Sequence, residues 1–160
     1  MKTVTYDYLG HYPEHISSIA QWHQDQWHSI SPELTTALRI KQYSAYPSQQ
    51  GVPCCFIALV DNRPAGSASL VDSDMDTHPD LSPWLASVFV HPEFRKQGIA
   101  THLIELCIGN ARKANIKKLY LFTPDQLEFY QSRGWKLLKS DTYHGEHVDI
   151  MSFDLETHKD

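Results

Sequence analysis

Cysteine is scarce in this 160-residue chain, which has three, two of them adjacent at Cys54 and Cys55. Three cysteines with this spacing build neither a disulfide framework nor a zinc site, so we expect them to be reduced and inside the core. Basic charge is also scarce, because 14 lysines and arginines stand against 19 aspartates and glutamates, a net charge of -5. A nucleic-acid-binding protein usually has a basic surface, so the sequence predicts no nucleic-acid partner.

Long apolar runs are missing as well. Residues 1–6 lack the apolar stretch of a signal peptide, and no segment has the length that a membrane span needs. These absences favour a cytoplasmic protein without a membrane partner. The composition is otherwise that of a globular protein, 41% hydrophobic and 11% aromatic over 160 residues, which fits a single domain spanning residues 1–160.

The most informative stretch runs from residue 84 to residue 126. Residues 84–90 are apolar and partly β-branched, which predicts a buried strand, and Pro92 prevents its ladder from continuing. A basic loop with one glycine follows at 95–100, at the place where a helical pattern begins. The first N–H groups of a helix are unpaired and its dipole is positive there, so the adjacent Arg95 and Lys96 favour a bound phosphate.

Three segments of the chain resemble signatures of the GCN5-related N-acetyltransferases, the GNAT family. Residues 95–100 are similar to the family's Arg/Gln-x-x-Gly-x-Gly/Ala loop, and residues 88–92 to its hydrophobic-x-Val-x-Pro strand end. Residues 129–135 are similar to its Phe-Tyr-x-x-x-Gly-Phe segment. The three occur in the family's order, separated by a helical and a strand pattern, so the chain is identified as a member. The N-terminal half carries no such motif.

The resemblance implies an α+β fold, with a mixed, mostly antiparallel twisted sheet that contains a splayed parallel strand pair and is flanked by helices (the acyl-CoA N-acyltransferase fold). The sequence patterns agree with this fold. Residues 85–90 and 119–122 are the expected parallel pair, joined by a crossover helix over 99–115. Further strands are expected at 4–8, 54–60, 65–70, 135–138 and 148–155, and further helices from 16, from 31 and from 123.

Two helix starts are predicted in detail. Ser31 is the expected N-cap of the second helix, with Pro32 at its first position. The buried side of that helix is expected to consist of Leu34, Ala37 and Leu38. Thr123 is the expected N-cap of the last helix, with Pro124 at its first position and Gln126 completing a capping box.

The resemblance also implies a donor and its binding site. Acetyl-CoA is the expected co-substrate, and no metal is expected. The strand end is expected to bind the pantetheine and to position the acetyl carbonyl through the backbone of Val88, Phe89 and Val90. The loop and the helix start are expected to hold the pyrophosphate through Arg95, Lys96, Gln97, Gly98, Ile99, Ala100 and Thr101. Gln126 has two possible roles, a contact with cofactor amides or its own helix cap.

In the family the amine attacks the thioester directly and passes through a tetrahedral intermediate. Tyr130 matches the family position that protonates the leaving sulfur, and a phenol with an ordinary pKa of about 10 stays protonated at neutral pH. The alternative for Tyr130 is a packing role beside Phe129. No residue is assigned as the general base. The candidates are Asp72, Asp74, Asp76, Asp125 and a chain of water molecules.

The acidic stretch at 72–76 superficially resembles a calcium loop, but Thr77 stands at the glycine position and Pro83 at the position of the closing glutamate. It is either a solvated loop or a segment that attracts a cationic amine near the acceptor entrance. The ten histidines show no metal-ligand pattern. One stripe of the first helix is expected to be mostly core, with one or two rings facing the acceptor. This stripe consists of Trp22, His23, Trp27 and His28.

These patterns predict an N-acetyltransferase that moves an acetyl group from acetyl-CoA to a primary amine, with a small-molecule acceptor favoured. The alternatives are a protein N-terminal or lysine acetyltransferase, or a CoA-binding module without catalysis. Residues 123–130 resemble family members that acetylate protein N-termini. A hydrolase is not favoured, because the chain has no Gly-x-Ser-x-Gly elbow. A homodimer is left open.

Overall fold

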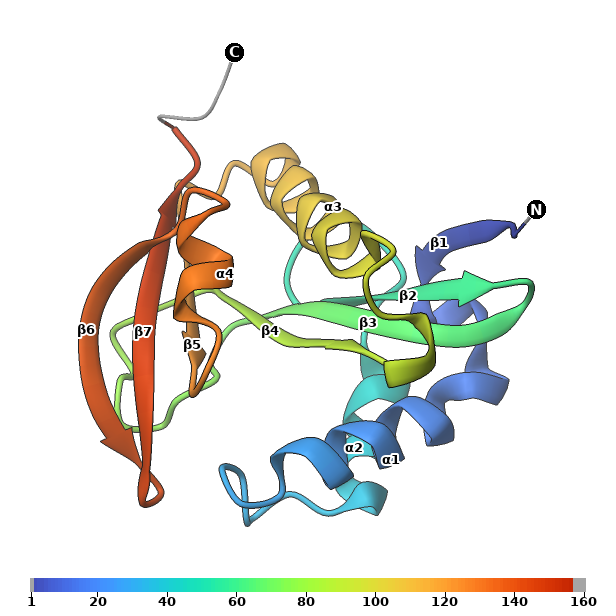
Figure 1. The fold of residues 1–160 in the computed structure, drawn as a ribbon, viewed down its shortest axis with the longest axis horizontal. Coiled ribbons are helices and arrows are strands. Elements are labelled where there is room, and N and C mark those ends of the chain that lie inside the picture. Colours follow the sequence, from blue (N-terminus) through green and yellow to red (C-terminus); the bar gives the residue numbers. More distant parts are fainter. Residues whose placement is uncertain (1, 157–160) are drawn as a thin grey trace.

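The computed structural model of the protein describes residues 2–156 (Figure 1). One sheet of seven strands has the order β1-β2-β3-β4-β5-β7-β6. The strands are β1 (Val4–Tyr8), β2 (Cys54–Val60), β3 (Arg63–Val71), β4 (Trp84–Val90), β5 (Lys118–Thr123), β6 (Lys136–Tyr143) and β7 (Glu146–Asp154). The helices are α1 (Ile16–Trp27), α2 (Thr36–Ala45), α3 (Ile99–Lys113) and α4 (Leu127–Gln131), with short 3-10 turns at Leu9–His11, Pro13–His15 and Pro92–Phe94. The expected α+β architecture is confirmed.

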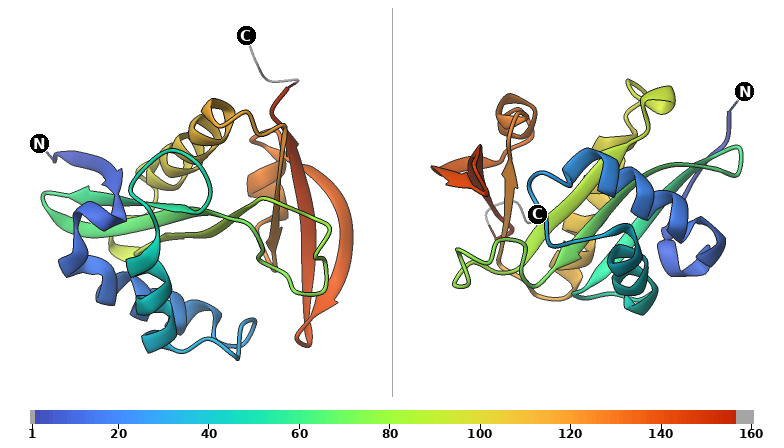
Figure 2. Two further views of the ribbon diagram at one scale, coloured as in Figure 1. Left: turned by 180° about the vertical axis from the view of Figure 1, so that it is seen from behind. Right: turned by 90° about the horizontal axis from the view of Figure 1, so that it is seen from below.

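Helices cover both faces of the sheet. Figures 1 and 2 show α1 and α2 against one face of the β2–β4 region and α3 against the other. Two hydrophobic clusters fill these interfaces, one under α3 and one under the two N-terminal helices. The three cysteines are free and buried inside them, and burial raises the pKa of Cys55 to about 12. The prediction of reduced core cysteines is confirmed.

The sheet opens between β4 and β5. These two strands are parallel, and the pair Trp84–Tyr120 is the register partnership between them, next to a bond from the Tyr120 N–H to the Pro83 carbonyl at 3.1 Å. All the other neighbouring strands are antiparallel over longer stretches. Beyond Trp84 the two strands diverge, and the halves β1–β4 and β5–β7 run in different directions (Figure 1). The splayed parallel pair is therefore confirmed.

A bulge interrupts β4 beside this opening. Residues Ser67 and Ser69 of β3 pair with Phe89 and Ala86, so β4 carries one extra residue at this point. Ser87 lies in the bulge with a φ of 55°, a conformation that is uncommon for any residue except glycine. The bulge turns the backbone of β4 just before the strand end that was expected to bind the donor.

The start and the buried side of α2 differ from the prediction. Helix α2 begins at Thr36, and Thr35 caps it by accepting the Leu38 N–H at 3.1 Å. The predicted Ser31 start is wrong, because residues 31–34 form a turn closed by a bond from the Leu34 N–H to the Ser31 carbonyl. The predicted buried side is also wrong. Leu34 is half-buried, Ala37 and Leu38 are exposed, and the buried residues of α2 are Arg39 and Tyr43.

The start of α4 is partly as predicted. Thr123 Oγ1 accepts the N–H groups of Gln126 and Asp125 at 3.0 and 3.4 Å, so its capping chemistry is confirmed. The helix itself begins only at Leu127, and the Gln126 side chain makes no capping bond. The predicted helix position of Pro124 and the capping box are therefore wrong. A polar turn that ends β5 takes their place.

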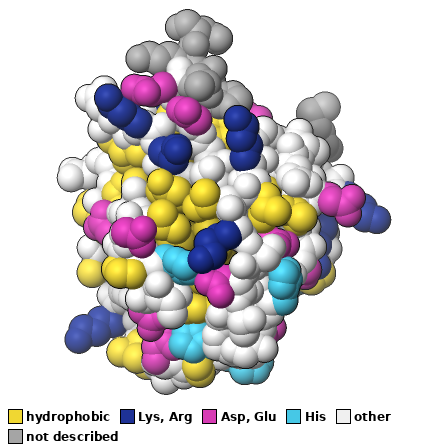
Figure 3. Space-filling model, turned by 90° about the vertical axis from the view of Figure 1, so that its left-hand side faces the viewer, with side chains coloured by type: hydrophobic (Ala, Val, Ile, Leu, Met, Phe, Trp, Pro, Cys, Tyr) yellow, Lys and Arg dark blue, Asp and Glu magenta, His cyan; other side chains and the backbone are white. Residues whose placement is uncertain are grey.

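The outer strand β6 exposes two leucines among polar residues. Leu137 and Leu138 are 45% and 48% exposed, and Figure 3 shows hydrophobic side chains gathered across the face of the molecule on this side. A homodimer stays a prediction. Within residues 2–156, no helix combines the length and the hydropathy that a bilayer crossing requires.

Candidate active site

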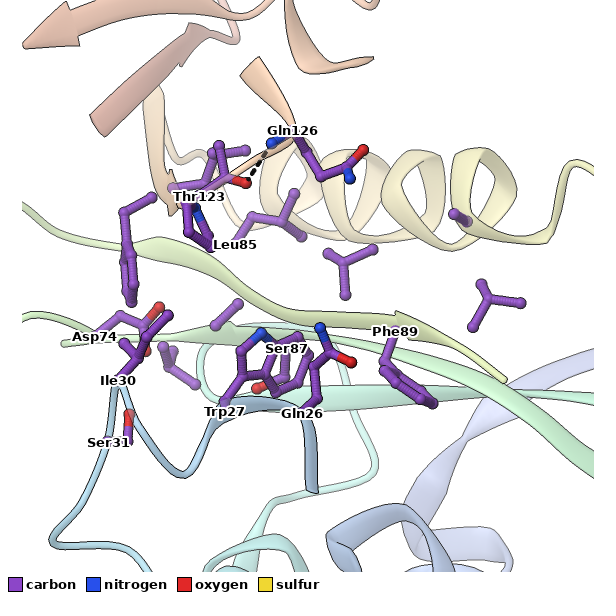
Figure 4. A pocket seen from close by; sticks show the side chains of 18 of the residues that line it. Gln26, Trp27, Ile30, Ser31, Asp74, Leu85, Ser87, Phe89, Thr123 and Gln126 are labelled. Carbon is purple, nitrogen blue, oxygen red and sulfur yellow. Dashed lines mark hydrogen bonds between the residues drawn. The ribbon is translucent and has the colours of Figure 1, made fainter. Parts of the chain in front are cut away.

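A cavity of about 1300 Å³ lies at the opening of the sheet. It has two sides, which Figure 4 shows in close-up: Trp27, Ile30 and Asp74 lie on one side of β4, and Thr123 and Gln126 lie on the other. We call the first the acidic side, lined by the α1–α2 segment, the β3–β4 loop and the β6–β7 turn. We call the second the α3 side, lined by the start of α3, the end of β5 and α4.

The α3 side contains the predicted anion cradle. Gly98 is the N-cap of α3 with a φ of 79°, and the first helical bond runs from the His102 N–H to the Gly98 carbonyl at 3.1 Å. The N–H groups before His102 therefore have no partner within the helix. Lys96 also has a positive φ of 65°, and two such residues around one loop form a concave backbone that suits an anion. A Cβ at Gly98 would meet nothing within 4 Å, so the space beside this backbone is open.

The structure places ten of the eleven predicted donor-site residues along this cavity, the exception being Gln97. Arg95 has a second task, since its Nε donates to the Val90 carbonyl at 2.8 Å. The guanidinium also lies 5.9 Å from the centre of the Phe89 ring. Arg95 thus fixes the end of β4, and the Val90 carbonyl already has a partner.

Arg133 is a cavity residue that the sequence analysis missed. Its Nε donates to Thr101 Oγ1 at 3.0 Å, and the guanidinium stacks 3.6 Å from the Phe129 ring. It brings a further positive charge to the first turn of α3. The sequence feature that could have identified it is its position directly before Gly134, the glycine of the third motif.

Tyr130 lies in α4 and is 8% exposed while still lining the cavity. Its ring packs edge-on against Phe129 and Trp135, with centroids at 5.1 and 6.0 Å. Burial raises the pKa of the phenol, so the hydroxyl keeps its proton at neutral pH. Both predicted roles, packing and proton donation, are compatible with this position.

Asp74 differs from the other candidate bases. Burial raises the pKa of its carboxyl to about 7, against the opposing influence of Arg39. It follows Ser73 at the edge of the cavity and precedes Met75, which is fully buried and anchors the loop. The other candidates Asp72, Asp76 and Asp125 are exposed, and Asp72 does not line the cavity.

A chain of hydrogen bonds runs under the acidic side to the bulge of β4. Arg39 Nη1 donates to Tyr43 Oη at 3.5 Å, and Tyr43 Oη lies 2.8 Å from His23 Nδ1. His23 Nε2 lies 2.8 Å from Ser67 Oγ, which donates to the Ser87 carbonyl at 3.1 Å. Arginine can only donate and a carbonyl can only accept, so every proton between the two ends has one consistent position.

This chain places a proton on His23 Nε2, and a neutral ring then accepts the Tyr43 hydroxyl at Nδ1. Burial lowers the pKa of His23 to about 3, with Arg39 as a second cause, which agrees with a neutral ring.

Of the predicted aromatic stripe, Trp27 lines the cavity, and the ring of the buried His23 packs against it with centroids 5.0 Å apart. Trp22 packs on Phe89 instead. His28 is exposed and the two tryptophans are half-buried, so the prediction that the stripe is mostly core is wrong.

Among residues 2–156 no three histidine, cysteine or acidic side chains come together as a metal site. Individual histidines pair with single carboxylates, as His78 does with Asp141 at 2.9 Å and His147 with Asp149 at 3.2 Å. Neither pair lines the cavity.

A mixed sheet that opens between two parallel strands, with an anion cradle at the helix that joins them, defines the class of acyl-CoA-binding transferases. The family model described as Acetyltransferase (GNAT) family matches residues 16–135, which is most of the chain. The chain belongs to this family. The acyltransferase class and the acetyl-CoA donor that we expected from the sequence are those of the family. The expected membership of the GNAT family is confirmed.

Solved structures share the fold. The Salmonella typhimurium protein yncA, solved with its cofactor acetyl-CoA, has a TM-score of 0.71 at 15% identity and covers 100% of this chain and 97% of its own. An acetyltransferase of Streptococcus agalactiae 2603 has a TM-score of 0.70 at 19% identity, covering 94% and 98%. N-acetylglutamate synthase of Neisseria gonorrhoeae, complexed with coenzyme A and N-acetyl-glutamate, has a TM-score of 0.66 at 18% identity, covering 97% of this chain and 35% of that one.

One relative is similar in sequence. An amino-acid acetyltransferase of Buchnera aphidicola subsp. Schizaphis graminum is 33% identical over 54 residues, which are 34% of this chain and 12% of that protein. The chain therefore matches only a small part of this relative's length.

Proposed function

We propose that the protein transfers the acetyl group of acetyl-CoA to the primary amine of a small molecule, by direct attack of the amine. One observation carries this proposal: a single cavity joins the anion cradle of α3 to the half-buried carboxyl of Asp74, through the opening between β4 and β5. A donor on one side and an acceptor on the other can meet only at this opening. The bulge at Ser87 lies there.

On the α3 side, the unpaired N–H groups at 98–101 and the cations Arg95, Lys96 and Arg133 hold the pyrophosphate. The free edge of β4 at 88–90 orients the pantetheine, since β5 has diverged from it. When bound, acetyl-CoA supplies a thioester carbonyl that accepts the amine. Gln126 lines the same side, and since its side chain makes no helix cap, the cofactor contact is the favoured of its two roles.

Asp74 is the proposed general base. A carboxyl with a pKa of about 7 is ionised in a useful fraction at neutral pH and still basic enough to take a proton from an ammonium or from a water molecule beside it. Tyr130 is the proposed general acid on the α3 side. Its raised pKa keeps the proton available for the departing sulfur.

A small acceptor is favoured over a polypeptide because a hydrogen bond joins two segments that line the acidic side. Ser29 Oγ donates to Glu146 Oε2 at 2.5 Å, which joins the segment after α1 to the turn between β6 and β7. This exposed bridge spans the cavity rim, where an extended peptide would need an open groove. The similarity to a protein named as an amino-acid acetyltransferase also supports a small acceptor.

The test is an assay of thiol release from acetyl-CoA over a panel of small amines and peptides, together with calorimetry of acetyl-CoA binding. We expect turnover with small amines. Turnover with peptides alone would favour a protein acetyltransferase. Tight binding without turnover of any amine would favour a CoA-binding module.

A further inference from the structure

Helix α2 buries its arginine and exposes its leucine. Arg39 is 3% exposed whereas the adjacent Leu38 is 46% exposed. Taking a guanidinium out of water costs several kcal/mol unless its charge and its N–H groups find partners. Both buried residues of α2, Arg39 and Tyr43, line the cavity. A partner for the buried guanidinium is therefore to be sought there.

Two of the three nitrogen atoms of the Arg39 guanidinium have partners, and the third has none. Nε donates to Gln24 Oε1 at 3.1 Å and Nη1 to Tyr43 Oη at 3.5 Å. Nη2 is buried and has no hydrogen-bond partner. No carboxylate of the described residues forms an ion pair with Arg39. A buried charged donor in this state is rare in folded proteins, and a carboxylate is a partner that suits the free N–H groups of a guanidinium.

The surroundings restrict what can approach Arg39. The acidic side of the cavity is lined by four carboxylates, Glu33, Asp74, Asp76 and Glu146, and Arg39 is its single cation among the described residues. Such a wall attracts an ammonium group and repels a second negative charge. A ligand that satisfies both the wall and Arg39 carries one amine and one carboxylate.

The position of Arg39 also restricts the length of that ligand. Its Nη1 lies 3.5 Å from Tyr43 Oη. A hydrogen bond from the side chain of Ser87, in the β4 bulge, acts on the same hydroxyl and lowers its pKa against the larger effect of burial. The guanidinium is therefore one side chain away from the strand where acetyl transfer is proposed. A molecule held by Arg39 places a reacting amine at the bulge only if amine and carboxylate are close together, as in an α-amino acid.

We propose that Arg39 binds the carboxylate of the acceptor through Nη2, so that the acceptors are small amino acids with neutral or basic side chains. This inference deepens the proposed function and rests on it. Arg39 is the specificity residue and Asp74 faces the amine. Amines without a carboxylate are then poor acceptors, and so are acidic amino acids.

The test compares each amino acid with its α-carboxamide, a pair that differs in one charged group. We expect the wild-type protein to prefer the acid by about 10- to 100-fold in kcat/KM, and to prefer glutamine over glutamate. The carboxamide has the less basic amine, so more of it is unprotonated at neutral pH. This difference alone would favour the carboxamide, and a preference for the acid is therefore not explained by it. Arg39→Gln is expected to remove the preference by lowering kcat/KM for the acid alone, while the acetyl-CoA affinity measured by calorimetry is unchanged.

The matched control is Arg63→Gln, which removes an exposed arginine paired with Glu93 outside the cavity and is expected to keep the preference. Equal rates for acid and carboxamide in the wild-type protein would overturn the inference and leave the proposed function standing. Equal losses for both substrates in Arg39→Gln would also overturn it. Failure to acetylate any amine would overturn both. The wild-type comparison decides the matter even if the variant does not fold.

Discussion

Replacing Asp74 by asparagine is expected to lower activity and raise stability at the same time. In an unfolded chain the pKa of this carboxyl is 3.8, and burial raises it to about 7 in the folded protein. Folding therefore takes up a proton between these values. The contribution of Asp74 to stability is fully present below pH 3.8 and is lost as the pH rises through about 7.

The magnitude follows from the two pKa values. At about 1.4 kcal/mol for each pH unit between them, an ionised Asp74 disfavours folding by at most about 4 kcal/mol above pH 7. Solvent contact of the partly exposed side chain reduces this figure. We expect Asp74→Asn to increase the free energy of unfolding in urea by about 1–3 kcal/mol at pH 8, and by less at pH 5.

The same substitution is expected to lower kcat/KM about 100-fold. In the wild-type protein kcat/KM should rise tenfold per pH unit up to about pH 7, where Asp74 becomes ionised. The variant should lack this break. Asp72→Asn is the control, because Asp72 is exposed on the same loop and does not line the cavity. An Asp74→Asn protein with wild-type kcat/KM and the same pH profile would refute the assignment of the base.

Three further outcomes are expected. Tyr130→Phe lowers kcat with little change in the acetyl-CoA affinity measured by calorimetry, and equal losses in both would favour a packing role. Gly98→Glu abolishes acetyl-CoA binding, because it puts a charge of the wrong sign and a side chain into a cradle with a φ of 79°; an unchanged Kd would contradict the cradle. Gly66→Ala lowers stability, since its Cβ would lie 2.7 Å from the Phe89 carbonyl oxygen, whereas Gly109→Ala, which meets nothing within 4 Å, raises it by about 1 kcal/mol. Urea unfolding of the two variants should give opposite signs.

The C-terminal half of the molecule was predictable because local and global signals agree there. Apolar strand patterns and the glycine of the cradle each have one structural meaning, and β4, α3, β5 and β7 lie close to their expected positions, whereas β6 runs from Lys136 to Tyr143, well beyond the expected end at residue 138. Three spaced motifs then predicted a set of residues of which all but Gln97 line one cavity. The polar turn at Thr123 was half predicted, since its hydroxyl chemistry is local whereas the length of α4 depends on packing.

The acceptor side could not be predicted, because its helix breaks the pattern on which prediction depends. The rule that apolar residues form the buried stripe of a helix predicts a buried Leu38 and an exposed Arg39. In the structure Arg39 is buried and Leu38 is exposed. The pairing of Arg39, Tyr43, His23 and Ser67 joins three elements that are far apart in the sequence. Asp74 was one of several equivalent acidic residues until burial distinguished it.

Trp84 and Tyr120 are the register partners at which the two halves of the sheet, β1–β4 and β5–β7, meet. Trp84 is fully buried, and its indole N–H donates to the Leu81 carbonyl at 2.7 Å. It packs in one cluster with Ile30, Met75 and Ile150, which come from both halves, yet it does not line the cavity. Because this indole fills the space where the two halves of the sheet meet, a smaller ring there is expected to change how β4 and β5 diverge, without removing any side chain that lines the cavity.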